Sequence, residues 1–418
     1  MRDLRQSNVD WLGKIPQDWD IHKLKHLVSI SKRIAGKEGL DVLSVTQRGI
    51  RIKDIESNEG QLAANYSGYQ LVYPGDFIMN QMDLVTGWVD RATQWGVTSP
   101  DYRVFSLVGN RVSADFLRYV MQCCYMNRVF FGLGHGVSDK GRWRLATRAF
   151  LNFEVPIPST DEQEAIVAYL DQKIYEWDDL EQAIRARIDV LEAYKRSVIF
   201  DAVTKGFDAS KELRPSGVPW IPQIPDGWSV NRGKYVLMPI SRPTLSDDEV
   251  ITCFRDGEVT LRRNRREEGC TFSEKEFGYQ LIEPGDLVVH GMDGFAGAIG
   301  ISDSRGKGSP VLNILDSDQN KRFLMYLLRC YAYIGVFLAT ATGIRVRSVD
   351  IRWSKIAELP LILPPRDVQD QVVAFLDDRI KRVDHAIEAK SRQLDLIEDY
   401  KKSLVYEMVT GKREVPVR

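Results

Sequence analysis

The sequence predicts an α+β protein that is built twice. We expect two similar mixed α/β domains joined by two long antiparallel coiled-coil helices about a pseudo-two-fold axis. Two observations predict this class: an internal repeat of about 206 residues, and a long apolar repeat of helical period in each copy. The chain has 418 residues, of which 44% are hydrophobic and 28% charged, enough for more than one hydrophobic core.

The repeat appears in three separate segments. The stretch WLGKIPQDW from Trp11 returns as WIPQIPDGW from Trp220, 209 residues later. The stretch GYQLVYPGD from Gly68 returns from Gly278, and QEAIVAYLD from Gln163 returns as QDQVVAFLD from Gln369. A period this long is far outside the range of solenoid repeats, so each copy is expected to be a domain with an appendage.

The expected boundaries follow the prolines and glycines that flank the appendages. Pro158 and Pro365 precede the helical segments, with Ser159, Thr160, Asp161 and Asp367 as candidate caps, and Gly206 and Gly411 end them. The expected segments are a first domain at 1–157, a first spacer helix at 158–206, a second domain at 207–363, a second spacer helix at 364–412 and a tail at 413–418.

Each appendage is predicted to be one long helix. Apolar residues recur in alternating steps of three and four from Val167 to Ala202 and again from Val373 to Met408, which is typical of a coiled coil. Lys195 and Lys401 interrupt the two series at the same point. This match favours pairing of the helices over separate packing of each on its own domain. Because domain termini usually lie close together, the helices should run antiparallel, with the domains at opposite ends.

The domains themselves show short strand and helix signals. Pro-Gly-Asp turns at 74–76 and 284–286 separate apolar runs. A helix is expected to close each domain, at 114–131 and at 321–338. The expected strands lie within 41–45, 71–79, 102–108 and 281–290.

Cysteine and histidine spacing predicts no disulfide framework and no metal site. The five cysteines lack a C-x-x-C pair, and His22 and His26 have no H-E-x-x-H carboxylate between them. No run of 18 apolar residues and no signal-peptide core is present, so we expect a cytoplasmic protein.

Enzyme motifs were tested and none predicts a catalytic residue. The segment 130–134 fits the F-x-G-x-G loop of adenosylmethionine-dependent methyltransferases, but it ends an expected helix instead of opening one. Its counterpart at 337–341 lacks both glycines, and no Asn/Asp-Pro-Pro-Tyr/Phe motif follows. The segment 300–308 resembles a phosphate loop with the wrong spacing.

Charge is distributed unevenly along the chain, although the net charge is −1. Residues 164–204 have nine acidic and five basic residues, and residues 367–409 have ten and seven, so the remainder has a net charge of +6. Each copy has two arginine-rich clusters, of which the second falls at the corresponding place in both copies. The clusters predict contacts to DNA phosphates and guanine edges, with solvated loops as the alternative. The predicted DNA-binding residues are Arg51, Lys53, Lys140, Arg142, Arg144, Arg262, Arg263, Arg265, Arg345 and Arg347.

The motifs together resemble the specificity subunit of a type I restriction–modification enzyme. The resemblance rests on Trp11, Ile15-Pro16 and Trp19, the Tyr-Pro-Gly-Asp at 73–76, the proline-led helix with a glutamine seven residues before a Leu-Asp pair, and the Lys-x-Ser tail from Lys195 and Lys402. It covers essentially the whole chain and is weakest over 241–275. It implies two target-recognition domains that each read one half of a bipartite DNA site, with the helices setting the spacer between them.

The same resemblance implies partners that hold the cofactors. Modification (methyltransferase) subunits would bind S-adenosylmethionine, translocase–nuclease subunits would bind ATP and Mg, and this chain would bind double-stranded DNA without catalysing a reaction. The pseudo-two-fold predicts two modification subunits docked on the acidic helix flanks. The expected docking residues are Trp177, Asp178, Asp179, Asp377 and Asp378. A coiled-coil scaffold with protein-binding domains and an orphan DNA methyltransferase stay open as alternatives.

Overall fold

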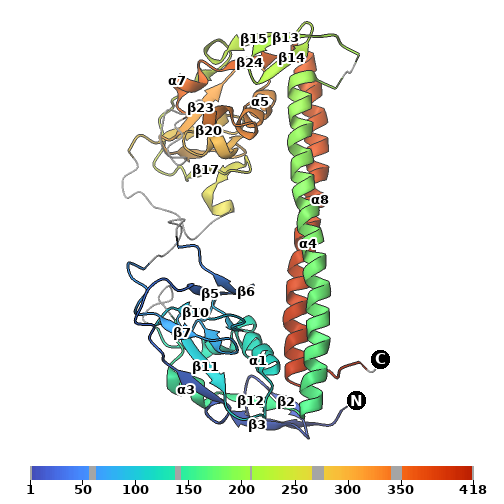
Figure 1. Cartoon of the computed structure of the whole chain (residues 1–418). Helices are drawn as coiled ribbons and strands as arrows, with labels where there is room; N and C mark the ends of the chain where they lie inside the picture. The colour runs from blue at the N-terminus through green and yellow to red at the C-terminus, as the bar shows by residue number, and fades with distance from the viewer. Residues whose placement is uncertain are drawn as a thin grey trace. The chain divides into compact units, whose positions relative to one another are not determined.

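The computed structural model describes residues 2–55, 63–136, 143–207, 210–265, 277–339 and 351–416. It divides into two compact units (Figure 1). Unit 1 comprises Met1–Ile184 with Arg392–Arg418, and unit 2 comprises Arg185–Ser391. Each unit therefore contains one globular body, part of the first long helix and part of the second. The segment boundaries expected from the sequence stay predictions.

Unit 1 is built on a four-stranded antiparallel sheet in the order β4-β11-β8-β9, surrounded by two-stranded ribbons. Its helices are α1 Ala114–Met126, α2 Val129–Gly132, α3 Thr147–Asn152 and the start of α4 Thr160–Lys205, with a 3-10 turn at Leu24–His26. Its strands are β1 Leu4–Gln6, β2 Lys14–Pro16, β3 Asp20–Lys23, β4 Val28–Ser31, β5 Leu43–Thr46, β6 Gly49–Ile52, β7 Gln70–Val72, β8 Phe77–Met79, β9 Val89–Arg91, β10 Gly96–Thr98, β11 Arg103–Leu107 and β12 Glu154–Ile157.

Unit 2 repeats this topology with the sheet order β16-β23-β20-β21. Its helices are α5 Lys321–Tyr333, α6 Val336–Ala339, α7 Trp353–Ile356 and the start of α8 Arg366–Val409, with 3-10 turns η2 Gly233–Tyr235, η3 Arg262–Asn264 and η4 Gly294–Ala296. Its strands are β13 Leu213–Val218, β14 Ile221–Pro225, β15 Ser229–Arg232, β16 Met238–Pro239, β17 Ile251–Cys253, β18 Val259–Leu261, β19 Gln280–Ile282, β20 Leu287–His290, β21 Ile299–Ile301, β22 Gly306–Gly308, β23 Leu312–Asp316 and β24 Pro360–Leu363.

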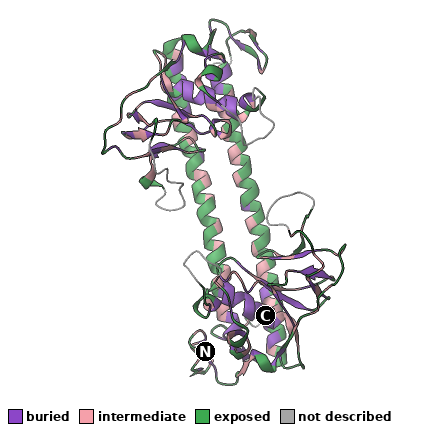
Figure 2. Ribbon diagram, turned by 90° about the vertical axis from the view of Figure 1, so that its left-hand side faces the viewer, coloured by how far each residue is buried: buried purple, intermediate pink, exposed green. Residues whose placement is uncertain are grey.

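Each sheet is covered by one amphipathic helix that also contacts a long helix. Ser113 caps α1 by accepting from the Phe116 amide at 3.1 Å, and Asn320 does the same for α5. The buried face of α1 packs with Leu170 in the core of unit 1, as the buried face of α5 does with Leu376 in unit 2. Figure 2 shows these buried residues gathered in the body of each unit.

The expected single helices at 114–131 and 321–338 are wrong in one respect, because each is broken into two. Arg128 adopts φ 55° between α1 and α2, and Gly335 adopts φ 80° between α5 and α6. A left-handed residue cannot continue an α-helix. The break recurs in both units, so it is a feature of the repeat.

The long helices pair in antiparallel register within each unit. Lys401 of α8 bonds Asp178 of α4 at 2.6 Å in unit 1, and Lys195 of α4 bonds Asp384 of α8 at 2.5 Å in unit 2. The two pairs correspond, since each partner of the second lies 206 residues from one of the first. Every position of the apolar series predicted from 167 to 202 and from 373 to 408 is buried or half-buried, while the outer faces are exposed (Figure 2). The predicted fold class is confirmed.

Buried tyrosines fasten each body to the long helices. Tyr119 on α1 donates to Asp171 of α4 at 2.5 Å, and Tyr326 on α5 donates to Asp377 of α8 at 2.7 Å. Burial, together with the neighbouring carboxylate, raises the pKa of both phenols. Both hydroxyls therefore stay protonated as donors at neutral pH.

Candidate nucleic-acid interface

In unit 1 the first basic cluster lies on the hairpin formed by β5 and β6. Gly49 adopts φ 94° in its turn, and Leu43 pairs with Ile52 at its open end. Arg51 is exposed on β6, and Lys53 follows the strand, half-buried, with its amide donating to the Val42 carbonyl at 2.7 Å. The hairpin thus presents basic side chains at a strand end fixed by backbone hydrogen bonds.

Unit 2 carries its first basic cluster on the corresponding hairpin, β17 and β18. The Arg262 amide donates to the Val250 carbonyl at 2.8 Å, which matches the Lys53 to Val42 bond. Arg263 pairs with Glu249 at 2.6 Å, and Arg265 pairs with Asp256 at 2.6 Å. These pairs lie at the surface, where an ion pair contributes about 0–1 kcal/mol, so a phosphate can displace the carboxylates.

The second basic cluster is described only in part. Lys140, Arg142, Arg345 and Arg347 lie outside the described residues. Arg144 is exposed, and its backbone exchanges two hydrogen bonds with His135 at 3.0 and 3.1 Å. Its neighbour Trp143 stacks on Phe131 with ring centroids 5.2 Å apart. The end of the cluster at Trp143 and Arg144 is therefore held against α2 and the residues that follow it.

The same pair of hydrogen bonds anchors the end of this cluster in both units. The Leu145 amide donates to the Gln81 carbonyl at 3.0 Å, while Arg103 donates to the Leu145 carbonyl at 3.1 Å. In unit 2 the Ile351 amide donates to the Gly291 carbonyl at 2.7 Å, and Asn313 donates to the Ile351 carbonyl at 2.9 Å. Sequence reasoning missed these anchors. Arg103 and Asn313 lie 210 residues apart at matched strand positions, but they differ in residue type.

Arg103 performs this task without a carboxylate partner among the described residues. It is 3% exposed, and its guanidinium lies over the Phe150 ring at 4.3 Å. Burial lowers its pKa to about 10, so the group is still cationic at neutral pH. A buried cation directly behind the second basic cluster adds positive potential there.

The turn that receives this anchor in unit 2 depends on His290. Its Nδ1 accepts from the amides of Met292 at 3.2 Å and Asp293 at 3.0 Å. In unit 1 Asn80 occupies the same place and accepts from the Met82 amide at 3.2 Å. Burial lowers the pKa of His290, and Arg255 lowers it further, while Asp293 opposes them.

We expect acid to loosen this turn. The folded pKa of His290 is below its unfolded value of about 6.5, so the unfolded chain binds more protons between the two values. The stability that neutral His290 contributes is present above about pH 6.5 and is lost as the pH falls through the folded pKa. Denaturant unfolding at about pH 7.5 and about pH 5.5 measures this loss. His290→Asn keeps an acceptor and removes the titration, so an unchanged pH dependence in that variant would contradict the assignment.

In the glycine loop noted at 130–134, the space beside Gly134 is already filled. Its first residues belong to α2, and a Cβ at Gly134 would lie 2.4 Å from the Trp143 ring. The Trp143 indole, which donates to the Phe131 carbonyl at 2.7 Å, fills the space beside that glycine. Over the described ranges, no group of three or more His, Cys, Asp or Glu residues is placed to hold a metal ion.

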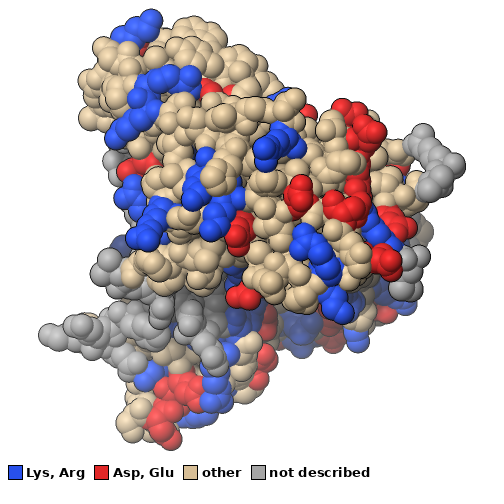
Figure 3. All heavy atoms as spheres, turned by 90° about the horizontal axis from the view of Figure 1, so that it is seen from below, with Lys and Arg blue, Asp and Glu red and all other residues tan. Residues whose placement is uncertain are grey.

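Charged side chains of both signs are interspersed on the face drawn in Figure 3. Lys and Arg form several separate groups there, with Asp and Glu between them. A surface of this kind does not by itself provide one continuous track for phosphates.

In the part of the chain that is described, no helix is long and apolar enough to cross a bilayer.

The predicted docking residues lie on the long helices in different surroundings. Trp177 is half-buried and packs edge-on against Tyr400 with centroids 5.6 Å apart. Asp178 is bonded to Lys401, and Asp377 also accepts from Arg322 at 2.7 Å. Asp179 is exposed. Asp378, also exposed, pairs with Arg382 one turn along α8.

Sequence reasoning missed an exposed apolar face on the same helices. Val190 of α4 is 62% exposed and Leu396 of α8 is 67% exposed, and the two residues are related by the 206-residue repeat. Tyr194 and Tyr400, one turn beyond each, are also exposed. Both Val190 and Leu396 lie outside the apolar series that pairs the helices. An apolar residue at the same repeat position of both helices, outside that series, is the sequence signal that could have identified this face.

Known proteins resemble the chain over its whole length. No protein-family model matches it. The putative type I restriction enzyme MjaX specificity subunit of Methanocaldococcus jannaschii is 20% identical over 97% of this chain and 96% of its own length. The type I restriction enzyme MjaVIII specificity subunit of the same organism is 21% identical over 96% and 94%.

A solved structure extends the likeness to the fold. A chain from a study of complex assembly and conformational transition of the type I R-M system matches with a TM-score of 0.67 at 13% identity. The match covers 96% of this chain and 99% of that one. The resemblance inferred from the repeated motifs is thereby confirmed: from end to end, the chain is similar to the specificity subunits of type I restriction enzymes.

Proposed function

We propose that this chain is the non-catalytic DNA-recognition subunit of a type I restriction–modification complex. Each unit reads one half of a bipartite DNA target, and the paired helices fix the unread spacer. The observation that carries the proposal is the duplicated basic hairpin. Lys53 and Arg262 follow equivalent strands and make equivalent backbone bonds, as half-sites read by two similar domains require.

The cofactors of the reaction belong to partner subunits in this proposal. Modification subunits bind S-adenosylmethionine, and translocase–nuclease subunits bind ATP and Mg, while this chain binds only double-stranded DNA. The Trp143 ring packed against Gly134 argues against an orphan methyltransferase. Calorimetry of the isolated chain with S-adenosylmethionine separates the two functions, since an orphan methyltransferase must bind it.

The DNA-reading function is tested in the host cell and in solution. Sequencing of modified adenines with and without the gene should show one bipartite motif that disappears with the gene. DNA affinity of the reconstituted complex should fall steeply with salt, because phosphate contacts release counterions. A coiled-coil scaffold with protein-binding domains predicts neither result.

The recurrence of the exposed apolar face supports docking of two identical partners. Val190 with Tyr194 in unit 2 and Leu396 with Tyr400 in unit 1 form equivalent surfaces beside the acidic flanks. Exposed apolar patches of this kind commonly mark protein interfaces. Equivalent surfaces bind equivalent partners, so two modification subunits per chain are expected.

Native mass measurement should therefore give a complex of two modification subunits with one copy of this chain. Val190→Asp or Leu396→Asp alone should reduce it to one modification subunit, and the double variant should bind none. A buried carboxylate without a partner costs several kcal/mol at such a surface. Ser391→Asp, at an exposed position of α8 on another flank from Leu396 and Tyr400, is the matched control and should leave the mass unchanged. A one-to-one complex of the unaltered chain that methylates normally would contradict the symmetry argument.

A further inference from the structure

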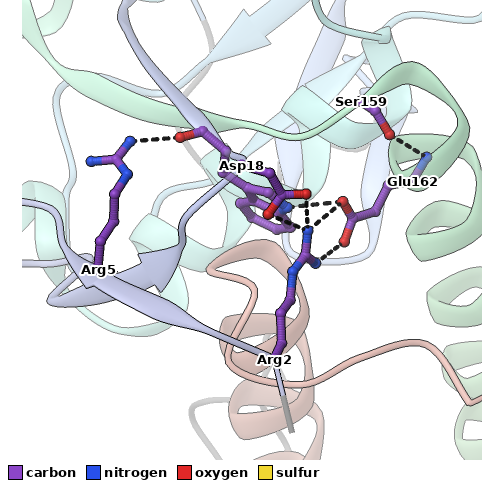
Figure 4. Close-up of polar contacts among 6 residues, drawn as sticks. Arg2, Arg5, Asp18, Ser159 and Glu162 are labelled. Carbon is purple, nitrogen blue, oxygen red and sulfur yellow. Dashed lines mark hydrogen bonds and ion pairs between the residues drawn. The ribbon is translucent and has the colours of Figure 1, made fainter.

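Unit 1 contains a polar cluster around one buried tryptophan, where the first strands meet the start of α4. Trp19 is 1% exposed, and its indole N–H donates to Glu162 at 2.9 Å. Arg2 bonds the same carboxylate and also donates to Asp18 at 2.8 and 2.6 Å. Figure 4 shows Arg2 between Asp18 and Glu162. The Glu162 carboxylate thus satisfies the buried indole, and Arg2 balances its charge.

The residues of unit 2 that correspond to Arg2 and Glu162 can be identified from matching hydrogen bonds in the two units. Arg5 donates to the Trp19 carbonyl, as Arg214 donates to the Trp228 carbonyl. This match places Lys211 where unit 1 has Arg2, because each lies three residues before the matched arginine.

Matching hydrogen bonds at the start of each long helix identify the residue that corresponds to Glu162. Gln163 donates to the Pro158 carbonyl at 3.0 Å, and Gln369 donates to the Pro364 carbonyl at 2.9 Å. Their preceding residues therefore correspond, so Val368 stands where unit 1 has Glu162. Unit 2 therefore has the tryptophan and a cation at the equivalent positions but a valine in place of the carboxylate.

This difference leaves a polar group without a partner among the described residues. Trp228 is 2% exposed, and no described residue accepts a hydrogen bond from its buried Nε1. Trp228 lines a cavity of about 110 Å³, together with Lys205, Lys211, Val368 and Gln371. One water takes about 30 Å³ of liquid, so the cavity has room for a carboxylate group. A buried N–H left unpaired costs about 1–3 kcal/mol.

The start of α8 adds to the preference for an anion. In unit 1 the Ser159 hydroxyl accepts from the Glu162 amide at 3.3 Å. Pro365 stands in the place of Ser159 in unit 2 and has no hydroxyl. The positive end of the α8 dipole therefore faces this region without the serine cap or the glutamate that α4 has.

We propose that this cavity in unit 2 is a carboxylate-binding site. An external carboxylate takes the place that Glu162 fills in unit 1, accepts from Trp228 Nε1, and is neutralised by Lys211. The shared chemistry is that of acetate or of an Asp or Glu side chain on a bound protein. The site stands on the geometry of unit 2 and does not depend on the proposed DNA-reading function.

The proposal is tested by recording the indole N–H resonances of the full chain, labelled with nitrogen-15 in its nine tryptophans. Acetate is the probe, and chloride at equal ionic strength is the control. Acetate should give a saturable downfield shift of the Trp228 N–H and leave Trp19, already bonded to Glu162, unmoved. Lys211→Ala should weaken the acetate response at least roughly tenfold.

Two reciprocal variants make the test decisive. Val368→Glu should shift the Trp228 signal without acetate and abolish its response. Glu162→Val should make the Trp19 signal respond. A Trp228 signal that neither acetate nor Val368→Glu moves would overturn the proposal.

The source of the carboxylate is settled by two further arms. A Trp228 shift on adding the modification subunit without acetate identifies a protein side chain as the ligand, and a response to acetate alone identifies a free carboxylate. If the Trp228 signal of the isolated chain already lies at the downfield position of the Val368→Glu variant without acetate, the chain supplies its own acceptor and the external site is refuted.

Discussion

Removing one heptad from each long helix should shorten the DNA spacer by about three base pairs and leave both half-sites unchanged. Seven residues span about 10 Å of helix, and one base pair rises about 3.4 Å. The deletions are residues 183–189 of α4 and residues 390–396 of α8, which are matched by the register of the Lys195–Asp384 and Lys401–Asp178 pairs. The second deletion removes Leu396, so Ala389, which then takes its place, is replaced with leucine to keep the exposed apolar face. A whole heptad keeps the apolar series in phase.

The affinity of the shortened protein for the original target should fall by roughly 10³-fold or more, toward its non-specific binding. Selection from a pool of targets with varied spacers measures both the new spacer and the half-sites. Removing two residues from each helix instead is the control, because two residues rotate the apolar series by about 200° and should prevent pairing. An altered half-site sequence, or an unchanged spacer, would show that the helices do not measure the distance.

The duplicated plan and the helix pairing could be predicted because both depend on periodicity. An apolar residue every three or four positions over ten turns is a strong signal, and so is a motif that returns after 206 residues. The same periodicity identified Lys195 and Lys401 as matched positions. In the structure each lysine pairs with a carboxylate of the opposite helix.

The strands and side-chain contacts were harder to predict for physical reasons. Many strands have only three residues, too few for an alternating pattern to be read. The break at Arg128 needs a left-handed residue, which its sequence context does not announce. The bond from Tyr326 to Asp377 joins residues 51 apart in the chain, so their proximity follows only from the packed fold.

The sequence predicted which basic residues belong to the candidate interface, but it did not predict where they lie in the fold or what they contact. Lys53 and Arg262 fall at equivalent strand ends because the hairpin recurs, although the surrounding sequences differ. Arg263 and Arg265 are paired with carboxylates across the hairpin surface. Charge counting finds such residues but cannot assign their partners. The role of each one at DNA therefore stays a prediction.

Replacing Arg142, Arg144, Arg345 and Arg347 together with alanine should have the second large effect. The hydrogen bonds at Leu145 and Ile351 fix the backbone that follows both clusters. We expect the arginines to meet DNA in a defined pose. Each one that reads a base should cost about 1–3 kcal/mol and relax one position of the target. Each one that contacts a phosphate should weaken all sequences alike and lower the salt slope by about one.

Lysine substitutions at the same four positions separate these two roles. Lysine keeps the charge but lacks the planar fork that grips a guanine edge, so a phosphate contact should survive it and a base contact should not. Anisotropy titrations of the reconstituted complex at several salt concentrations report both effects. Arg185→Ala, at an exposed position of α4 on another flank from Val190 and Tyr194, is the matched control and should change neither. If the fourfold alanine variant bound its target with unaltered affinity and salt slope, the second basic cluster would have no place in the interface, and the hairpins of β5–β6 and β17–β18 would have to account for recognition.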